Sequence, residues 1–170
     1  MTRKLLKAVD TINGAIKAIL GVFLMIMSAI IIIQVVFRFI LHAALPWSEE
    51  LTRYLMIYIV FFGAAYAVRY NKLMRVEFVE TILPQKAQKW YFLLMNAVLI
   101  FTFLVITIAG FEFTRMALNQ RSPGLHVRMA YVYVAIPVSG LLMMMNSLAL
   151  TIEKFLSERE QKIQRGEVAE

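Results

Sequence analysis

Four long apolar runs constrain the fold of this chain more than any other feature of its sequence. They occupy residues 18–37, 51–68, 90–111 and 129–152, and the only charged residue within them is Arg53. A helix needs about 20 residues to cross a hydrocarbon core of roughly 30 Å, so each run is long enough. Lipid offers the backbone no hydrogen bonds, which leaves helices or closed barrels, and the runs lack the alternation of barrel strands. We predict transmembrane helices at about 15–41, 49–69, 90–113 and 129–153.

The composition also favours a membrane protein. Of the 170 residues, 61% are hydrophobic and 17% charged, whereas a soluble domain is roughly half apolar and a quarter charged. The absence of cysteine excludes disulfides, thiol catalysis and cysteine-bound metals. We therefore expect an all-α integral membrane protein with a single membrane domain over 1–170 and a charged cytoplasmic tail at 154–170. The first run exceeds the core of a cleaved signal peptide, so it should remain as an anchor.

The distribution of the basic residues predicts the orientation. The net charge is +7, but Lys and Arg lie between the apolar runs rather than in the single patch of a nucleic-acid binder, so no nucleic-acid partner is expected. Thirteen of the 18 fall on one side of the four helices: Arg3, Lys4, Lys7, Lys17, Arg69, Lys72, Arg75, Lys86, Lys89, Lys154, Arg159, Lys162 and Arg165. The positive-inside rule then places both termini in the cytoplasm.

The connection between the second and third helices carries apolar residues at helical spacing. Val76, Val79, Ile82 and Leu83 share one side of a helical wheel, and Pro84 ends the pattern. We predict a short amphipathic helix at the cytoplasmic surface. The alternative is an irregular turn with incidental apolar residues.

The start of the second helix gathers polar residues. Ser48 can cap the helix, while Glu49 and Glu50 in its first turn complement the positive end of the dipole. Trp47 suits the aromatic belt at the membrane surface. Glu49 and Arg53 are four residues apart and can pair on the helix surface. These features favour a structural role.

Arg38 lies near the outer end of the first helix and shares a face with Gln34. One explanation is that its side chain reaches the interface by snorkelling. The other is that Arg38 pairs with Glu49 or Glu50 and fixes the packing of the first two helices.

Small and polar residues inside the runs are expected to serve helix packing. Gly63 begins a small-residue stretch that extends to Ala67, as close helix contacts require. Asn96 and Asn146 are interpreted as packing residues rather than substrate ligands. Pro137 should kink the fourth helix and free a carbonyl for Ser139 or a neighbour.

No motif indicates catalysis. His42 and His126 fall in outward connections, whereas haem-binding anchors place their axial histidines within helices. The sequence lacks a phosphate loop, a Ser-His-Asp arrangement and metal-ligand spacing. We predict that the chain is not an enzyme and has no catalytic, cofactor-binding or metal-binding residues.

The chain resembles the small membrane subunit, DctQ type, of tripartite ATP-independent periplasmic (TRAP) transporters. The matching positions are Arg38, 47–51, Arg53, 62–65, 67–69, 76–78 and Ile136-Pro137. Many members of the family carry a histidine shortly before the 76–78 segment, where this chain has Leu73. Any role tied to that histidine does not transfer.

This resemblance implies a bacterial inner-membrane protein that braces a large elevator-type permease subunit. A periplasmic binding protein would deliver an organic acid, such as a sialic acid or C4-dicarboxylate, for sodium-coupled uptake. No cofactor is implied, and lipids are the remaining partner. Candidate structural or partner-interface residues are Arg38, Trp47, Glu49, Glu50, Arg53, Gly63 and Arg69. Candidate docking residues for the binding protein, in the third connection, are Arg115, Arg121, His126 and Arg128. Alternatively, these residues only solvate the helix ends and contact lipid headgroups.

Two rival functions remain open from the sequence. The chain could be a membrane anchor of an oxidoreductase, which bound haem or quinone would reveal. It could also be a free-standing small exporter, which would transport on its own.

Overall fold

The computed structural model describes residues 2–43, 45–70 and 85–164. Its helices are α1 (Thr2–Phe39), α2 (Pro46–Arg69), α4 (Gln85–Met116), the short 3-10 helix η1 (Ala117–Asn119), α5 (Met129–Tyr133) and α6 (Ala135–Gln164). Four segments are long and apolar enough to cross a membrane, with α5 and α6 together forming the fourth, so the predicted all-α membrane fold is confirmed. The predicted amphipathic helix lies outside the described residues.

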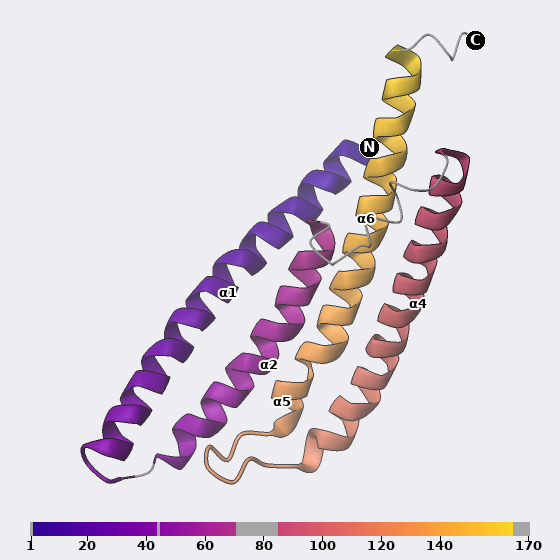
Figure 1. Ribbon diagram of the computed structural model, residues 1–170. Coiled ribbons are helices and arrows are strands. Elements are labelled where there is room, and N and C mark those ends of the chain that lie inside the picture. The colour runs from indigo at the N-terminus through magenta and orange to yellow at the C-terminus, as the bar shows by residue number, and fades with distance from the viewer. Residues whose placement is uncertain (1, 44, 71–84, 165–170) are drawn as a thin grey trace.

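The long helices stand side by side in a row (Figure 1). In spatial order they are α1, α2, α6 and α4, so the last helix of the chain lies between α2 and α4. The start of α1 and the end of α6 lie at the same end of the row, which we call the terminal end. The opposite end, with the connections after α1 and α4, is the loop end.

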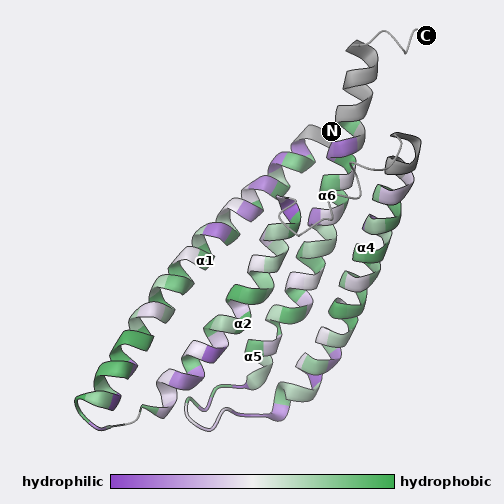
Figure 2. Ribbon diagram, in the orientation of Figure 1, coloured by the Kyte–Doolittle hydropathy of each residue, from purple (hydrophilic) through white to green (hydrophobic). Residues whose placement is uncertain are grey.

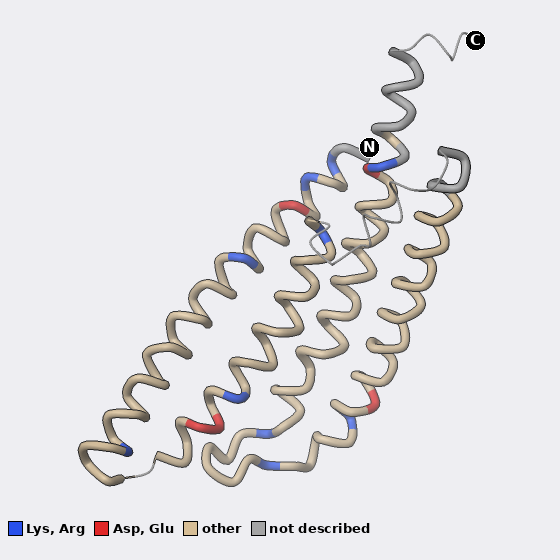
Figure 3. Tube along the Cα trace, viewed as in Figure 1, with Lys and Arg blue, Asp and Glu red and all other residues tan. Residues whose placement is uncertain are grey.

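Polarity follows the long axis of the row. Apolar residues fill the middle of the helices, as Figure 2 shows, and the charged residues gather towards the two ends (Figure 3). A middle zone of this kind matches the hydrocarbon core of a bilayer. The structure therefore suits a protein that crosses the membrane four times.

The first helix is longer than its apolar run. It begins at Thr2 rather than near residue 15, and its 38 residues extend about 57 Å at 1.5 Å per residue. The added turns remain helical because they pack: Asn13 and Ile16 are buried, whereas Thr11 and Lys17 on the other side are exposed.

The second helix begins at Pro46, with Leu45 in the capping position. Proline is well suited to the first helical turn, where its missing N–H is not needed. Ser48 is therefore not the cap that its sequence context predicted. It lies inside the first turn, fully buried, and its hydroxyl donates to the Leu45 carbonyl at 2.7 Å.

The fourth spanning segment is interrupted at Val134, between α5 and α6. Pro137 lies three residues further on and has no N–H for the Tyr133 carbonyl, which explains an interruption at this point. The Ser139 hydroxyl donates to the Ile136 carbonyl at 2.8 Å. The helix is thus interrupted before the proline, and the Ser139 hydroxyl serves the Ile136 carbonyl rather than that of Tyr133.

Two glycines allow α4 and α6 to approach closely. A Cβ atom on Gly140 would lie 2.4 Å from the Thr107 hydroxyl oxygen, and one on Gly110 would lie 2.8 Å from the Ile136 side chain. Glycine at an interface lets helix backbones come together where lipid provides no hydrophobic drive. A buried cluster of Ala65, Val68, Phe103 and Met143 completes the packing of α2, α4 and α6.

Candidate functional site

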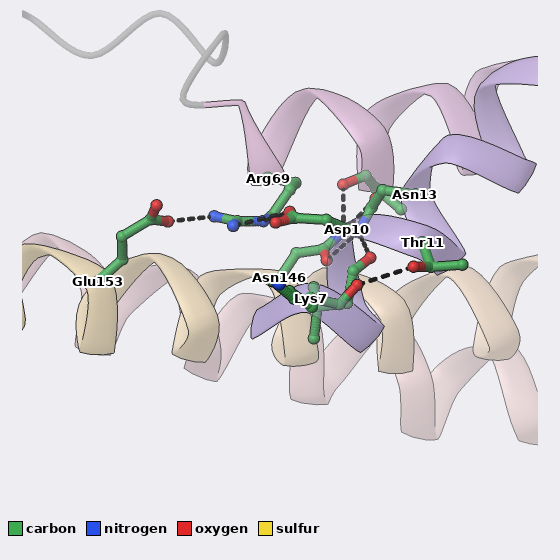
Figure 4. Close-up of polar contacts among 9 residues, drawn as sticks. Lys7, Asp10, Thr11, Asn13, Arg69, Asn146 and Glu153 are labelled. Carbon is green, nitrogen blue, oxygen red and sulfur yellow. Dashed lines mark hydrogen bonds and ion pairs between the residues drawn. The ribbon is translucent and has the colours of Figure 1, made fainter. Parts of the chain in front are cut away.

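The candidate residues form separate groups at the two ends of the row. At the terminal end, Arg69 joins three helices (Figure 4). Its Nε donates to an Asp10 carboxylate oxygen at 2.8 Å, and its Nη1 donates to Glu153 at 2.6 Å. The Arg69 side chain is 6% exposed, whereas those of Asp10 and Glu153 are 49% and 53% exposed. Arg69 is therefore fully engaged within the chain and holds α1 and α6 against the end of α2.

A pair of asparagines continues this polar group towards the middle of the row. Asn13 donates to the Asn146 side-chain oxygen at 2.7 Å, and Asn146 donates back at 3.0 Å. Asn146 also donates to the Ala65 carbonyl of α2 at 2.8 Å. Both asparagines are fully buried. The prediction that Asn146 is a packing residue is confirmed.

Further polar contacts join α4 to α6. The Ser147 hydroxyl donates to the Asn96 side-chain oxygen at 3.5 Å. The Lys154 ammonium lies 3.7 Å from the centre of the Phe92 ring, a cation–π arrangement. Asn96 thus also serves packing, as its sequence context predicted.

At the loop end, Glu50 binds the connection that follows α4. Its carboxylate accepts from the backbone N–H of Gly124 at 2.9 Å and of Leu125 at 3.0 Å, and from the Ser122 hydroxyl. A Cβ on Gly124 would lie 3.0 Å from the Glu50 carboxyl group, a tight contact that would require the carboxylate to shift by a few tenths of an ångström. Glu50 therefore links the start of α2 to a loop more than 70 residues later.

The connection bound by Glu50 is an ordered hairpin over residues 120–129. The Ser122 N–H donates to the Val127 carbonyl at 2.9 Å, and the Met129 N–H donates to the Gln120 carbonyl at 3.0 Å. These two bonds flank an antiparallel bridge between the residues in the middle. The third connection is consequently a defined structure rather than a tether.

The hairpin carries three of the four candidate docking residues. Arg121 and Arg128 face each other in the bridge, and His126 occupies the left-handed region with φ 55° near the turn. Arg115 lies in the last turn of α4. All four side chains are exposed.

Of the two explanations offered for Arg38, the pairing with Glu49 or Glu50 is not observed among the described residues. Within the described part of the chain, Arg38 has no ion pair with Glu49 or Glu50, and its side chain is exposed. Its neighbour on the same face, Gln34, makes the contact instead and donates to Glu49 at 3.2 Å. Glu50 is turned to the hairpin, so neither carboxylate is directed to Arg38. The snorkelling explanation fits the exposed side chain.

Three candidates share one stripe of α2, exposed at its first four members and partly buried at its last two, which we call the α2 stripe. It consists of Glu49, Arg53, Met56, Val60, Gly63 and Ala67. Nothing lies within 4 Å of the position that a Gly63 Cβ would occupy, and Met56 and Val60 are more than half exposed. Arg53 forms no ion pair with the described residues, so the expected Glu49–Arg53 pair is absent there. Trp47, 41% exposed, precedes the stripe.

Five residues of these polar groups were not predicted from the sequence: Asp10, Asn13, Ser122, Ser147 and Glu153. Asp10 and Asn13 belong to the charged flank that precedes the first apolar run. Their spacing could nonetheless have indicated a role, because in a helix that begins at residue 2 both lie on the same side as Ile16. Their partners across the row could not be predicted, since they depend on which helices become neighbours.

Comparison with known proteins identifies the family. Residues 27–157 match the family model described as tripartite ATP-independent periplasmic transporters, DctQ component. The chain belongs to the DctQ family. It is accordingly a multi-pass membrane protein and a small permease subunit of the TRAP type.

Individual relatives carry matching names. The chain is 26% identical over 144 residues to the sialic acid TRAP transporter small permease protein SiaQ of Vibrio cholerae, covering 84% of this chain and 83% of the relative. It is 32% identical over 101 residues to the C4-dicarboxylate TRAP transporter small permease protein DctQ of Rhodobacter capsulatus, covering 58% and 44%. These names leave the oxidoreductase anchor without support.

A further relative differs in size. The sialic acid TRAP transporter permease protein SiaT of Haemophilus influenzae is 28% identical over 127 residues, which cover 73% of this chain. The matched part is only 20% of that relative, so the chain spans about one-fifth of its length.

Proposed function

We propose that this chain braces a large permease subunit during sodium-coupled uptake of an organic acid. A periplasmic binding protein delivers that acid, and both termini of the chain lie in the cytoplasm. The chain itself has no catalytic role. Sodium coupling and the elevator motion belong to the large subunit and follow from the family resemblance. The substrate is a sialic acid, a C4-dicarboxylate or another carboxylate.

The organisation of the Haemophilus relative supports a membrane partner. Its permease is one polypeptide of which this chain matches one-fifth. The unmatched four-fifths of a permease are the natural equivalent of a separate large subunit. In that relative the region similar to this chain and the rest of the permease belong to one polypeptide. Where the two parts are separate polypeptides, we expect them to assemble.

The observation that carries the proposed interface is Arg53 on the α2 stripe. Arg53 lies two turns into a spanning helix, is exposed, and has no ion pair with the described residues. A charged side chain inside a membrane span is costly unless it finds a partner or water. Gly63 lies further along the same stripe, where the absence of a side chain permits close approach of another helix. We infer that the large subunit covers this stripe.

Co-purification with the large subunit tests this interface. Gly63→Leu should release the large subunit, because leucine would separate the two backbones, and Arg53→Leu should weaken the complex. Gly21→Leu is the matched control: Gly21 lies on α1, and it too has nothing within 4 Å of the position that a Cβ would occupy. Loss of the partner with Gly21→Leu but not with Gly63→Leu would place the interface on α1. Retention in all three variants would show that Arg53 only snorkels to the interface.

Transport in proteoliposomes tests the function. The chain, the large subunit and the binding protein should together take up labelled sialic acid or a C4-dicarboxylate when a sodium gradient is imposed. Omitting this chain should abolish uptake. Uptake without sodium, or uptake by this chain alone, would contradict the proposal.

A further inference from the structure

The contacts of Glu50 are unusual for a carboxylate at the start of a helix. It does not cap α2; it accepts from two backbone N–H groups and one hydroxyl of the hairpin 120–129. Hydrogen bonds to an ionised acceptor are roughly twice as strong as neutral ones. The adjacent Glu49 has no contact of this kind, since its side chain accepts from Gln34 on α1. Glu50 therefore holds the turn of the hairpin against the start of α2, while the Tyr54 hydroxyl, also on α2, donates to the Met129 sulfur at the end of the hairpin at 3.4 Å.

The hairpin in turn fixes two arginines beside each other. The bonds from Ser122 to Val127 and from Met129 to Gln120 flank the Arg121–Arg128 bridge, which makes the arginines a non-hydrogen-bonded pair. Side chains come closest at such pairs, and like charges there are destabilising.

No carboxylate of the described residues relieves this repulsion. Neither Arg121 nor Arg128 has an ion pair there, and both side chains are exposed. Glu50, the acidic group that contacts the hairpin, is already bound by its three donors. Two arginines placed opposite each other by the backbone, without a counter-ion among the described residues, provide donors for an incoming carboxylate, which arginine binds in a forked geometry.

We propose that Glu50 is a positioning residue that holds the hairpin so that Arg121 and Arg128 form a preformed receptor for acidic side chains of the periplasmic binding protein. The identity of that partner and its side of the membrane rest on the proposed function. The role of Glu50 in ordering the hairpin does not.

A transient soluble partner explains the rigid mounting better than lipid does. Preorganisation lowers the cost of ordering a site at each encounter. Lipid headgroups surround the chain at high local concentration and have little need of a preformed receptor. Rim charges of this kind act mainly on the association rate and its salt dependence.

The first experiment tests the clamp without any partner. Trypsin cleaves after arginine, so the rate of cleavage at Arg121 and Arg128 of the purified chain in detergent reports how ordered the hairpin is. Glu50→Gln should raise that rate roughly three- to tenfold, because charge-assisted bonds are lost. Glu49→Gln is the matched control and should cleave like wild type. Gly124→Ala, which crowds the Glu50 carboxylate, should also raise the rate. Unchanged cleavage in Glu50→Gln and Gly124→Ala would overturn the clamp.

The second experiment tests the receptor. In proteoliposomes, uptake is measured against the concentration of binding protein at several salt concentrations. Arg121→Ser with Arg128→Ser should raise the concentration for half-maximal uptake roughly tenfold at low salt and converge with wild type at high salt. Glu50→Gln should raise the same concentration to a smaller extent, again with convergence at high salt.

The outcomes separate the two ideas. Faster cleavage with an unchanged response to binding protein would keep the clamp and overturn the receptor. A shift that depends on the anionic lipid content of the liposomes, and not on binding protein, would assign the arginines to lipid. Loss of uptake in the wild-type complex would count against the proposed function and leave the cleavage result standing.

Discussion

Asn13 and Asn146 are separated by 133 positions in the chain and exchange two hydrogen bonds at 2.7 and 3.0 Å, fully buried between α1 and α6. Each amide satisfies the other where both side chains are shielded from solvent. A third bond reaches the Ala65 carbonyl of α2. This small polar junction joins the first, second and last spanning segments.

Replacing either asparagine should therefore destabilise the helix row. We expect Asn13→Ala or Asn146→Ala to cost about 1 kcal/mol in unfolding free energy, the scale of side-chain hydrogen bonds between membrane helices. The double variant should cost less than the sum, because both single changes break the same pair. Equilibrium unfolding in detergent measures the unfolding free energy of each variant. Thr102→Ala is the control, since its exposed hydroxyl donates only to Val98 within α4; strictly additive losses would contradict the coupling.

Arg69→Gln should loosen the terminal end of the row. The two carboxylates that Arg69 joins are half exposed and can be hydrated, so we expect a modest loss of about 1–2 kcal/mol. Spin labels at Thr11 and Ile152 should show a broader distance distribution between α1 and α6. Arg69→Lys should not restore the wild-type distribution, because an ammonium lacks the fork that reaches two carboxylates. A wild-type distribution in Arg69→Gln would show that the asparagine junction alone holds this end.

Gly140→Ala should force α4 away from α6. The added methyl would meet the Thr107 hydroxyl oxygen at 2.4 Å, and overpacking of this kind costs about 1–3 kcal/mol. Unfolding in detergent checks the loss. Adding Thr107→Ala should recover part of it, since the nearest clashing atom is then gone, while the Thr107 backbone N at 3.2 Å remains. Gly63→Ala is the control and should leave the stability of the isolated chain unchanged.

Reporter fusions test the orientation. The 13-to-5 distribution of Lys and Arg predicts a cytoplasmic reporter after Glu170 and a periplasmic one near Gly124. Alkaline phosphatase is active only in the periplasm and green fluorescent protein fluoresces in the cytoplasm, so the two reporters should give opposite patterns. The reverse pattern would show that both termini are periplasmic and that the hairpin lies in the cytoplasm.

Hydropathy was sufficient to predict the four spanning helices, because burying backbone in lipid leaves few alternatives. Hydropathy was not sufficient to predict which helices lie next to each other. Helices that are apolar on all sides carry little signal for which neighbour each face meets. The position of α6 between α2 and α4, and the roles of Gly110 and Gly140, therefore emerge only from the structure.

For the candidate residues too, the sequence identified the polar side chains but not their partners. Glu50 and Arg69 were both identified as candidate structural residues, but the sequence suggested only Arg38 as a partner for Glu50 and no partner for Arg69. In the structure Glu50 binds a loop more than 70 residues away, and Arg69 binds Asp10 and Glu153 on two other helices. Local spacing predicts pairs along one helix, such as Glu49 with Arg53, and contains no information on pairs across the row.

The place of α6 in the row also determines when the molecule can be completed during synthesis. A ribosome delivers the helices in chain order, so α1 and α2 can associate while the rest is still being made. The helix α4 follows, yet the surface that receives Gly110 and Thr107 belongs to α6, which is translated after it. Until that segment enters the bilayer, α4 has no α6 to pack against. The insertion of α6 therefore closes the junctions on both of its sides, including the asparagine pair that joins it to the first helix.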